Sequence, residues 1–148
     1  MKQTEKQKEF LGIIESAEIV YLSTVDAEGY PSTRAMLNLR NKNHFSHLDP
    51  LYKAEKNPFT VYLTTNATSQ KNREITANEK ASLYFYELVS FKTVILKGRI
   101  EVVTDNDFKQ KAWMDGWKDF YPEGPDSNAY SLLRFVPLSI NGDIEFSL

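Results

Sequence analysis

The first apolar positions of the chain recur at helical spacing. Phe10, Ile13, Ile14 and Ala17 fall on one side of a helix, and Thr4 with a glutamine three residues later resembles a capping box. The pattern predicts a helix over residues 4–17.

Most of the remaining chain has the pattern of β-strands. Residues 19–25 are β-branched and aromatic, a Gly-Pro turn occupies 26–31, and residues 32–40 alternate polar and apolar side chains, which predicts a hairpin. A long strand with a bend near Gly98 is expected from 92 to 103. Further strands are predicted over residues 59–65, 81–87, 130–136 and 138–146.

Helical and breaker signals punctuate these strands. Pro50 and Pro58 leave residues 41–58 as a loop or short helix, residues 69–78 form a predicted helix, and Asp105 caps another one. Strands outnumber helices about two to one, and no regular βαβ alternation occurs. We therefore predict a mainly β fold with peripheral helices, a six- to seven-stranded antiparallel barrel that forms one domain over residues 1–148.

Composition narrows the classes of partner. The 148 residues contain no Cys, which leaves no disulfide, no thiolate nucleophile and no Cys-based metal site. With 18 basic and 20 acidic residues the net charge is −2, so we expect neither nucleic acid nor an anionic membrane as a partner. The polar N-terminus and the lack of a long apolar run indicate neither signal peptide nor spanning helix, which favours a cytoplasmic protein.

A candidate anion site follows the strand at 59–65. The strand breaks at Asn66, and the next helix is headed by Ser69, Gln70 and Lys71. A helix start carries unpaired N–H groups and partial positive charge, so a cation there is unfavourable unless an anion offsets it. Either Thr68 or Ser69 is an ordinary N-cap with Lys71 in water, or this turn is a phosphate cradle.

A second candidate lies in the strand at 32–40. Strand alternation places Arg34 and Arg40 on one face of the sheet. Arg34 is either a solvated residue of an outer face or a planar fork for phosphate, and the residues alone leave both interpretations open.

The remaining candidates have structural interpretations. His44 and His47 lack a clear third metal ligand and are predicted to be loop histidines. The aromatic residues between 113 and 121 either pack a helix end onto the barrel or wall a ligand pocket. The sequence contains no nucleophile–base constellation and no Walker or GxGxxG loop.

Several weak motifs, taken in order, resemble the FMN-binding split barrels of the pyridoxamine 5′-phosphate oxidase-like superfamily. They are Pro31-Ser32-Thr33-Arg34-Ala35-Met36-Leu37, then Tyr62-Leu63-Thr64-Thr65 with Ser69-Gln70-Lys71, then Gly98 before Val102-Val103-Thr104-Asp105. Trp113, Phe120-Tyr121-Pro122-Glu123-Gly124-Pro125-Asp126 and Tyr130-Ser131-Leu132-Leu133-Arg134-Phe135 are similar to its general-stress-protein subgroup.

The resemblance implies an FMN site in a homodimer, with the flavin at the subunit interface. Arg34 would reach the phosphate region, Thr64 and Thr65 would meet the flavin, and Thr93 would face the ring. Ala35, Met36 and Leu37 would line the isoalloxazine. Ser69, Gln70 and Lys71 would hold the phosphate.

Departures from the oxidase pattern bear on the chemistry. Gln70 replaces the usual arginine, and Leu39 stands where the oxidases carry a lysine for the substrate phosphate. The C-terminal Arg-x-His pair is absent, and Phe146 stands near the place of a tryptophan common in general-stress relatives. True pyridoxamine phosphate oxidase activity is therefore not expected.

The cofactor that the resemblance implies sets the function classes. We expect a stress-related FMN-dependent oxidoreductase that passes hydride or electrons from a nicotinamide donor to an unknown small molecule. One alternative is a flavin-binding or storage module without turnover. Another is a barrel for haem or a deazaflavin, for which His44 and His47 are the available axial ligands.

Overall fold

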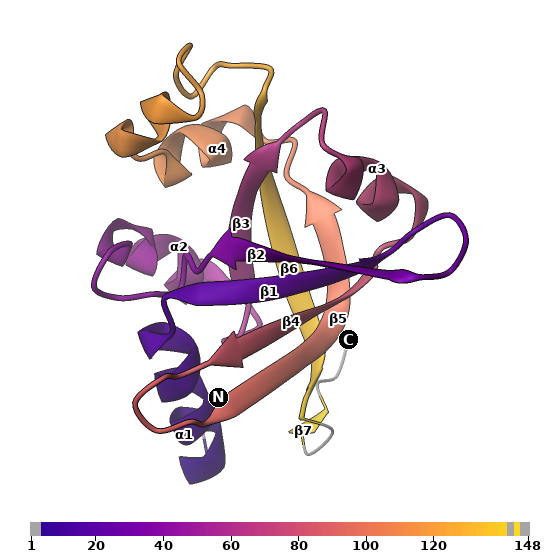
Figure 1. The fold of residues 1–148 in the computed structure, drawn as a ribbon. Coiled ribbons are helices and arrows are strands. Elements are labelled where there is room, and N and C mark those ends of the chain that lie inside the picture. Colours follow the sequence, from indigo (N-terminus) through magenta and orange to yellow (C-terminus); the bar gives the residue numbers. More distant parts are fainter. Residues whose placement is uncertain (1–3, 142–143, 146–148) are drawn as a thin grey trace.

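A computed structural model describes residues 4–141 and 144–145 of the chain. Its centre is one antiparallel sheet in the order β2-β1-β4-β5-β6-β3, with the short β7 paired to β6 (Figure 1). The strands are β1 (Ile19–Val25), β2 (Pro31–Leu37), β3 (Val61–Asn66), β4 (Lys80–Tyr86), β5 (Thr93–Val102), β6 (Tyr130–Ile140) and β7 (Ile144–Glu145).

The sheet curls into an open barrel. β2 and β3 are the two ends of the strand order, yet they approach each other in space, so the barrel is split between these edges. An edge strand presents unpaired backbone N–H and C=O groups. The predicted mainly β, antiparallel split barrel with peripheral helices is confirmed.

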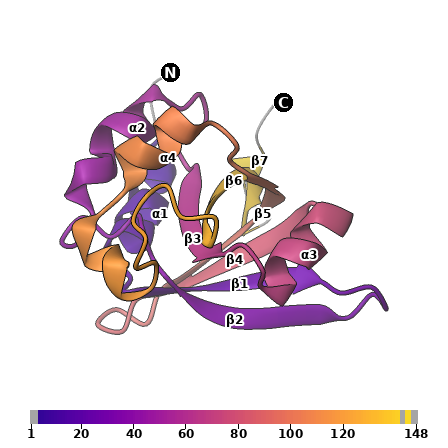
Figure 2. The same ribbon diagram turned by 90° about the horizontal axis from the view of Figure 1, so that it is seen from above.

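Helices surround the sheet on different sides. α1 (Glu5–Ser16) leads into β1, and α3 (Gln70–Ala77) bridges β3 and β4. α2 (Asp49–Ala54) and α4 (Asn106–Ala112) lie together on the side away from α3, as the view from above shows (Figure 2). The short 3₁₀ helices η1 (Ser46–Leu48) and η2 (Asp115–Asp119) accompany them.

The first helix forms as its sequence predicts. Gln7 donates its backbone N–H to Thr4 Oγ1 at 3.1 Å, and its side chain accepts from the Thr4 N–H at 2.9 Å. This capping box satisfies two N–H groups that would otherwise lack partners. Phe10, Ile13 and Ile14 form the buried face of α1, which packs in the barrel core.

Two apolar clusters fill the interior. The barrel core gathers residues that point inward from the sheet, α1 and α3, among them Val20, Leu22, Leu63, Leu83 and Phe85. The aromatic cluster lies under α2, α4 and η2. It contains Leu39, Phe45, Leu48, Tyr52, Tyr62, Val103, Ala112, Trp117, Tyr121, Tyr130 and Leu132.

The second strand ends three residues earlier than predicted. The chain leaves the sheet after Leu37 because Asn38 turns inward, where its side chain donates to the carbonyls of Ile14 and Ala17 at 2.7 Å each. Buried amide groups need such partners. The hairpin is therefore tied to the end of α1 rather than continued to Arg40.

The break predicted between the two closing strands, after residue 136, is wrong. The second predicted strand, 138–146, contains the end of β6 and also β7, and its residues 142–143 and 146 lie outside the described part of the chain. β6 runs without a break from Tyr130 to Ile140, through Pro137. Pro137 pairs with Gly98 at a register shift between Lys97 and Gly98, which confirms the predicted irregularity near Gly98. A bulge accommodates a proline in a sheet, so Pro137 does not end the strand after residue 136 as the sequence predicts.

Replacing Gly98 with alanine is expected to destabilise the fold. A Cβ at this position would lie 2.2 Å from the Val136 carbonyl oxygen and 2.8 Å from Pro137 Cα, so two backbones would have to move apart. We expect a loss of roughly 1–3 kcal/mol or more in the free energy of unfolding, measured by urea denaturation.

Gly12→Ala is the matched control. A Cβ on Gly12 meets nothing within 4 Å, and the residue lies in α1, where alanine has the higher helix propensity. Equal midpoints for Gly98→Ala and the wild type would contradict the close approach of β5 and β6.

Candidate functional site

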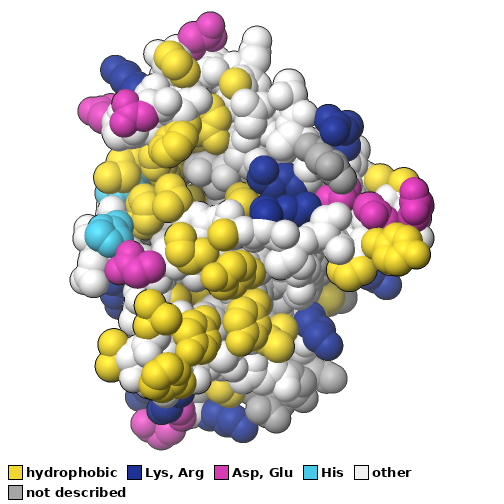
Figure 3. Space-filling view, in the orientation of Figure 1, with side chains coloured by type: hydrophobic (Ala, Val, Ile, Leu, Met, Phe, Trp, Pro, Cys, Tyr) yellow, Lys and Arg dark blue, Asp and Glu magenta, His cyan; other side chains and the backbone are white. Residues whose placement is uncertain are grey.

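The candidate site lies at the split between β2 and β3, where α3 begins. Dark blue Lys and Arg side chains face the viewer between β2 and α3 in the space-filling view, with acidic side chains beside them (Figure 3). β2 supplies Arg34, β3 supplies Thr65, and α3 supplies Lys71. The fold thus gathers groups from both edges of the open barrel around one helix start.

The start of α3 has the cap that its sequence predicts. Ser69 is the N-cap, and its hydroxyl accepts the backbone N–H of Asn72 at 3.4 Å and lies 3.3 Å from Thr65 Oγ1. The Asn72 side-chain oxygen is buried and, within the described residues, has no hydrogen-bond partner. A ligand hydroxyl is the kind of donor that such an oxygen accepts.

Lys71 is a half-buried cation in the first turn of this helix. Burial and the charge of Arg34 lower the pKa of its ammonium group. Both effects disfavour the charged form, as does the positive end of the helix dipole. Of these effects, the charge of Arg34 and the helix dipole supply positive potential at Lys71, which favours the binding of an anion.

Arg34 is already bound by groups of the protein. Its Nη1 donates to Thr24 Oγ1 at 2.8 Å and to the Leu22 carbonyl at 3.3 Å, and its Nη2 meets Glu74 Oε2 at 3.0 Å. Arg34 thus points to the inner side of the sheet, towards α3. Of the two interpretations of this arginine, an exposed position on the outer face is excluded.

Glu74 is the residue of this site that the sequence analysis missed. Its carboxylate accepts from Thr24 Oγ1 at 2.6 Å and Ser32 Oγ at 2.9 Å as well as from Arg34, and its side chain is only 6% exposed. These hydrogen bonds and the arginine lower its pKa, the contact with Thr24 most strongly, so the group is a carboxylate at neutral pH. Its position one turn after Lys71 on α3 was the available signal.

Arg40 does not share the site with Arg34. Its Nε donates to the Thr60 carbonyl at 2.8 Å, its Nη2 to the Pro58 carbonyl at 2.6 Å, and its guanidinium lies 3.9 Å from the centre of the Tyr52 ring. The prediction of two cations on one face is therefore wrong. It failed because β2 ends before Arg40.

The run from Ala35 to Leu37 divides between the two faces of β2. Met36 points inward and is 9% exposed, while Ala35 and Leu37 point outward and are exposed. An isoalloxazine ring that met all three residues would therefore contact the backbone edge of β2 rather than three side chains.

Thr64 and Thr65 also point to opposite sides. Thr65 is buried beside Ser69, whereas the Thr64 side chain hydrogen-bonds Tyr121 of the aromatic cluster. Burial raises the pKa of the Tyr121 hydroxyl, and the bond from Thr64 offsets part of this effect. Ser69 and Lys71 stand next to Thr65 rather than next to Thr64. The backbone of Gln70 forms the first residue of α3.

Thr93 lies away from the helix start. It begins β5, pairs with Tyr86, and is exposed on the outer face, with Ile95 following it on the same side. Arg34 points to the inner face and lies three strands away in the sheet order. One chain therefore does not bring Thr93 and Arg34 together.

The outer face around Thr93 is apolar. Side chains of β1, β2, β4 and β5 form a continuous exposed patch, visible as the yellow area below β2 (Figure 3). We call this set the outer patch. Its members are Ile19, Tyr21, Leu37, Tyr84 and Ile95, with exposures of 37–44%.

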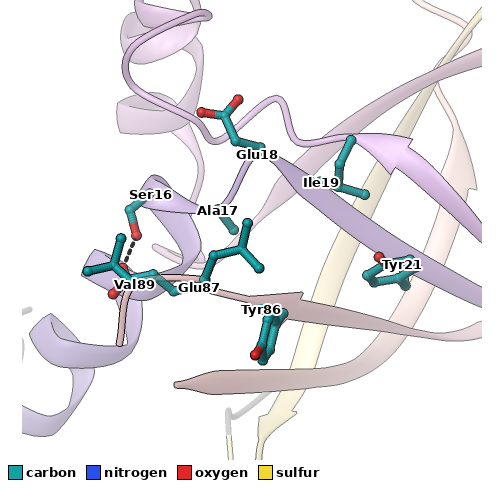
Figure 4. A pocket seen from close by; sticks show the side chains of 9 residues that line it. Ser16, Ala17, Glu18, Ile19, Tyr21, Tyr86, Glu87 and Val89 are labelled. Atoms are coloured by element: carbon teal, nitrogen blue, oxygen red, sulfur yellow. Dashed lines mark hydrogen bonds between the residues drawn. The ribbon is translucent and has the colours of Figure 1, made fainter. Parts of the chain in front are cut away.

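A cavity of about 500 Å³ adjoins the outer patch. It opens between the end of α1, the start of β1 and the end of β4. Ile19, Tyr21 and Tyr86 lie along one side (Figure 4). The Ser16 hydroxyl donates to Glu87 at the other side, and this contact and Ser90 lower the pKa of Glu87. Leu88 and Val89, 72% and 91% exposed, continue the apolar surface beyond it.

Each histidine lies beside an oxygen atom of the protein. His44 Nε2 lies 3.1 Å from a Glu18 carboxylate oxygen, and His47 Nε2 lies 3.2 Å from the Ala112 carbonyl. Among residues 4–141 and 144–145, no three His, Cys, Asp or Glu side chains converge.

Trp117 and Tyr121 are core residues, whereas Phe120 is 66% exposed. No helix in the described residues is long and apolar enough to cross a membrane.

The sequence of this chain matches a known protein family. The sequence profile for pyridoxamine 5′-phosphate oxidase matches residues 4–142, almost the whole chain. The chain belongs to this family. The motifs that suggested it, from Pro31 to Phe135, all lie within the match.

Curated relatives share the sequence but are longer. A pyridoxine/pyridoxamine 5′-phosphate oxidase of Rhizobium leguminosarum bv. trifolii is 34% identical over 113 residues, which cover 70% of this chain and 48% of the relative. A protein of the same name from Myxococcus xanthus is 28% identical over 141 residues, covering 95% and 57%. The chain thus spans about half the length of the curated relatives it matches.

Solved structures share the fold along the whole chain. A Clostridium acetobutylicum protein related to general stress protein 26 is 26% identical, with a TM-score of 0.71, and the match covers 95% of this chain and 96% of that one. An FMN-binding protein of Nostoc punctiforme related to pyridoxamine 5′-phosphate oxidase has a TM-score of 0.62 at 14% identity, over 95% and 84% of the two chains.

Proposed function

We propose that this protein is an FMN-binding flavoprotein and that the start of α3 holds the FMN phosphate. The observation that carries the proposal is Lys71, a half-buried cation whose charged form is disfavoured by burial, by Arg34 and by its helix position. The negative charge of a phosphate would offset the repulsion from Arg34 and the helix dipole and would favour the charged form of Lys71. The FMN-binding relative from Nostoc punctiforme supports the choice of flavin.

Each residue of the site has a distinct role under this proposal. Lys71 and the first N–H groups of α3 hold the phosphate, and Ser69 positions the helix start as its cap. The Asn72 oxygen is available to a ribityl hydroxyl. The backbone edges of β2 and β3 border the flavin, and the neighbouring Thr65 hydroxyl is held by Ser69.

The reaction class follows from the cofactor. FMN supplies hydride and single-electron transfer, and a nicotinamide donor and a small-molecule acceptor complete the proposed oxidoreductase. The protein's own task is to bind and orient the flavin and to exclude water.

Pyridoxamine phosphate oxidation itself is not proposed. Leu39 occupies the position at which the resemblance expects a lysine for the substrate phosphate, and it is 1% exposed in the aromatic cluster. A buried leucine offers no charge to a substrate. The substrate of this chain is therefore of a different kind.

The proposed assembly is a homodimer with FMN at the interface. The outer patch is a contiguous set of exposed apolar side chains, and the exposed loop residues Leu88 and Val89 continue the apolar surface beyond it. Contiguous apolar surface of this kind is typical of a protein–protein interface. Thr93 lies beside this patch, on the face opposite Arg34. If Thr93 faces the flavin ring, it reaches a flavin held by the second copy.

The purified protein is expected to be yellow, with the absorbance bands of oxidised flavin. Anaerobic NADH or NADPH should bleach these bands, because reduced FMN does not absorb there. The released chromophore should be identified as FMN by mass spectrometry. Bound FMN that neither donor reduces would leave a flavin-holding protein without turnover and refute the oxidoreductase part.

Lys71→Ala is expected to weaken FMN binding by roughly 10- to 100-fold, because one charge-assisted contact with phosphate is lost. Riboflavin lacks the phosphate, so its dissociation constant should change little. Both constants are measurable by quenching of flavin fluorescence. Lys53→Ala, an exposed lysine of α2, serves as the control. Equal losses for FMN and riboflavin would rule out a phosphate role for Lys71.

Tyr84→Asp is expected to convert the dimer into monomers, because it places a charge in the centre of the outer patch. Light scattering coupled to size-exclusion chromatography gives the mass of each variant. Phe120→Asp is the matched control, since Phe120 is even more exposed but lies outside the patch. A monomeric wild type, or an unchanged dimer in Tyr84→Asp, would exclude this surface as the interface.

A further inference from the structure

The candidate phosphate site contains a fixed negative charge. Glu74 lies one turn after Lys71 on α3, and its carboxylate accepts hydrogen bonds from Thr24 at 2.6 Å, from Ser32 at 2.9 Å and from Arg34 at 3.0 Å. It is nearly inaccessible, with 6% of the side chain exposed. A phosphate entering this site meets two cations and one anion.

Glu74 uses part of the binding capacity of Arg34. The guanidinium donates from Nη2 to Glu74 and from Nη1 to Thr24 and the Leu22 carbonyl. An arginine binds phosphate most strongly when its fork is free for two parallel contacts. Here both terminal nitrogens already have protein acceptors.

The same contacts separate the roles of the two cations. Arg34 is neutralised within a buried network, whereas Lys71 experiences positive potential although Glu74 stands on the same helix. Lys71 is therefore the group that gains most from an arriving phosphate. Gln70 adds no charge at this turn, so the net charge of these four side chains is +1.

We infer that Glu74 is a specificity-determining residue that weakens the phosphate contribution to flavin binding, so that this chain holds FMN reversibly. The inference rests on the proposed FMN site and adds to it a reason for modest affinity. A carboxylate on the helix that would hold the phosphate repels it, and a partly buried site screens this repulsion less than water does. This repulsion weakens the binding of FMN but not that of riboflavin, because riboflavin lacks the phosphate.

Glu74→Gln tests this inference with little change of shape. The amide oxygen, in the place of Oε2, still accepts from Arg34 and Thr24, and the amide nitrogen, in the place of Oε1, donates to the Ser32 hydroxyl, so the network keeps its hydrogen bonds and loses one charge. We expect FMN to bind about tenfold more tightly and to dissociate more slowly. Riboflavin affinity should change by less than about twofold.

Glu101→Gln is the matched control. Glu101 is also paired with an arginine, Arg134, at 3.0 Å, but it lies on β5 near the aromatic cluster. Its replacement should alter neither flavin. Thr24→Val adds a second comparison, because it removes a hydrogen bond to Glu74 without removing charge, and it should not tighten FMN.

Inorganic phosphate provides a readout that needs no flavin. Thermal unfolding of the flavin-free proteins in phosphate, compared with chloride at equal ionic strength, should show a larger rise in Tm for Glu74→Gln than for the wild type. FMN affinity that is unchanged or weaker in Glu74→Gln would overturn the inference, because Glu74 would then only position Arg34.

The outcomes also distinguish this inference from the proposed function. If Lys71→Ala leaves FMN binding intact, the phosphate site itself is misplaced. If Lys71→Ala weakens FMN but Glu74→Gln does not tighten it, the site stands and the role of Glu74 falls. If neither flavin binds and phosphate raises no Tm in Glu74→Gln, both fail.

Discussion

The carboxylate of Glu74 joins the two parts of the molecule that the candidate site requires. It connects α3 to the end of the β1–β2 hairpin through Thr24, Ser32 and Arg34. α3 is also held to the sheet by Ile75, which packs in the barrel core, and by Asn72, whose side-chain nitrogen donates to Ser131 Oγ of β6 at 3.2 Å. The charge that stabilises the hairpin–helix contact is thus the same charge that a phosphate would encounter, and structure and binding impose opposite demands on one residue.

Strand alternation gives β2 two functions. Arg34 and Met36 face inward, towards α3 and the barrel core, while Ala35 and Leu37 face outward and join the outer patch. Because successive side chains of a strand point to opposite faces, a motif that reads as one unit in sequence serves two surfaces in space. This division explains why a residue such as Thr93, on the outer face, is out of reach of Arg34 within one chain.

Local signals in the sequence predicted most of the fold. The capping box of Thr4, the N-caps Ser69 and Asp105 and the irregularity at Gly98 are all present, since each depends on nearby residues. The errors concern residues whose position depends on distant partners. Asn38 ends β2 by bonding to carbonyls around the end of α1, and Pro137 continues β6 because β5 bulges opposite it.

The candidate site was predictable only in part for the same reason. Ser69 and Lys71 follow from the helix start, but Glu74 acquires its role from Thr24 and Ser32, fifty and forty-two positions away. Arg40, which looked equivalent to Arg34, is held by Pro58, Thr60 and Tyr52. A cation becomes a candidate ligand only when its partners are known, and those partners come from the fold.

Comparison of the two arginine–carboxylate networks supports the proposed anion site by charge balance. Arg134 lies between Glu55 at 3.1 Å and Glu101 at 3.0 Å, so negative charge exceeds positive charge there, and these carboxylates hold the arginine charged with a raised pKa. Arg34 has one carboxylate and stands near a second cation, Lys71, whose pKa is lowered. Of the two networks, only the one around Arg34 carries more positive than negative charge. An anion therefore gains at the start of α3 and loses at Arg134, although both places present a partly exposed arginine.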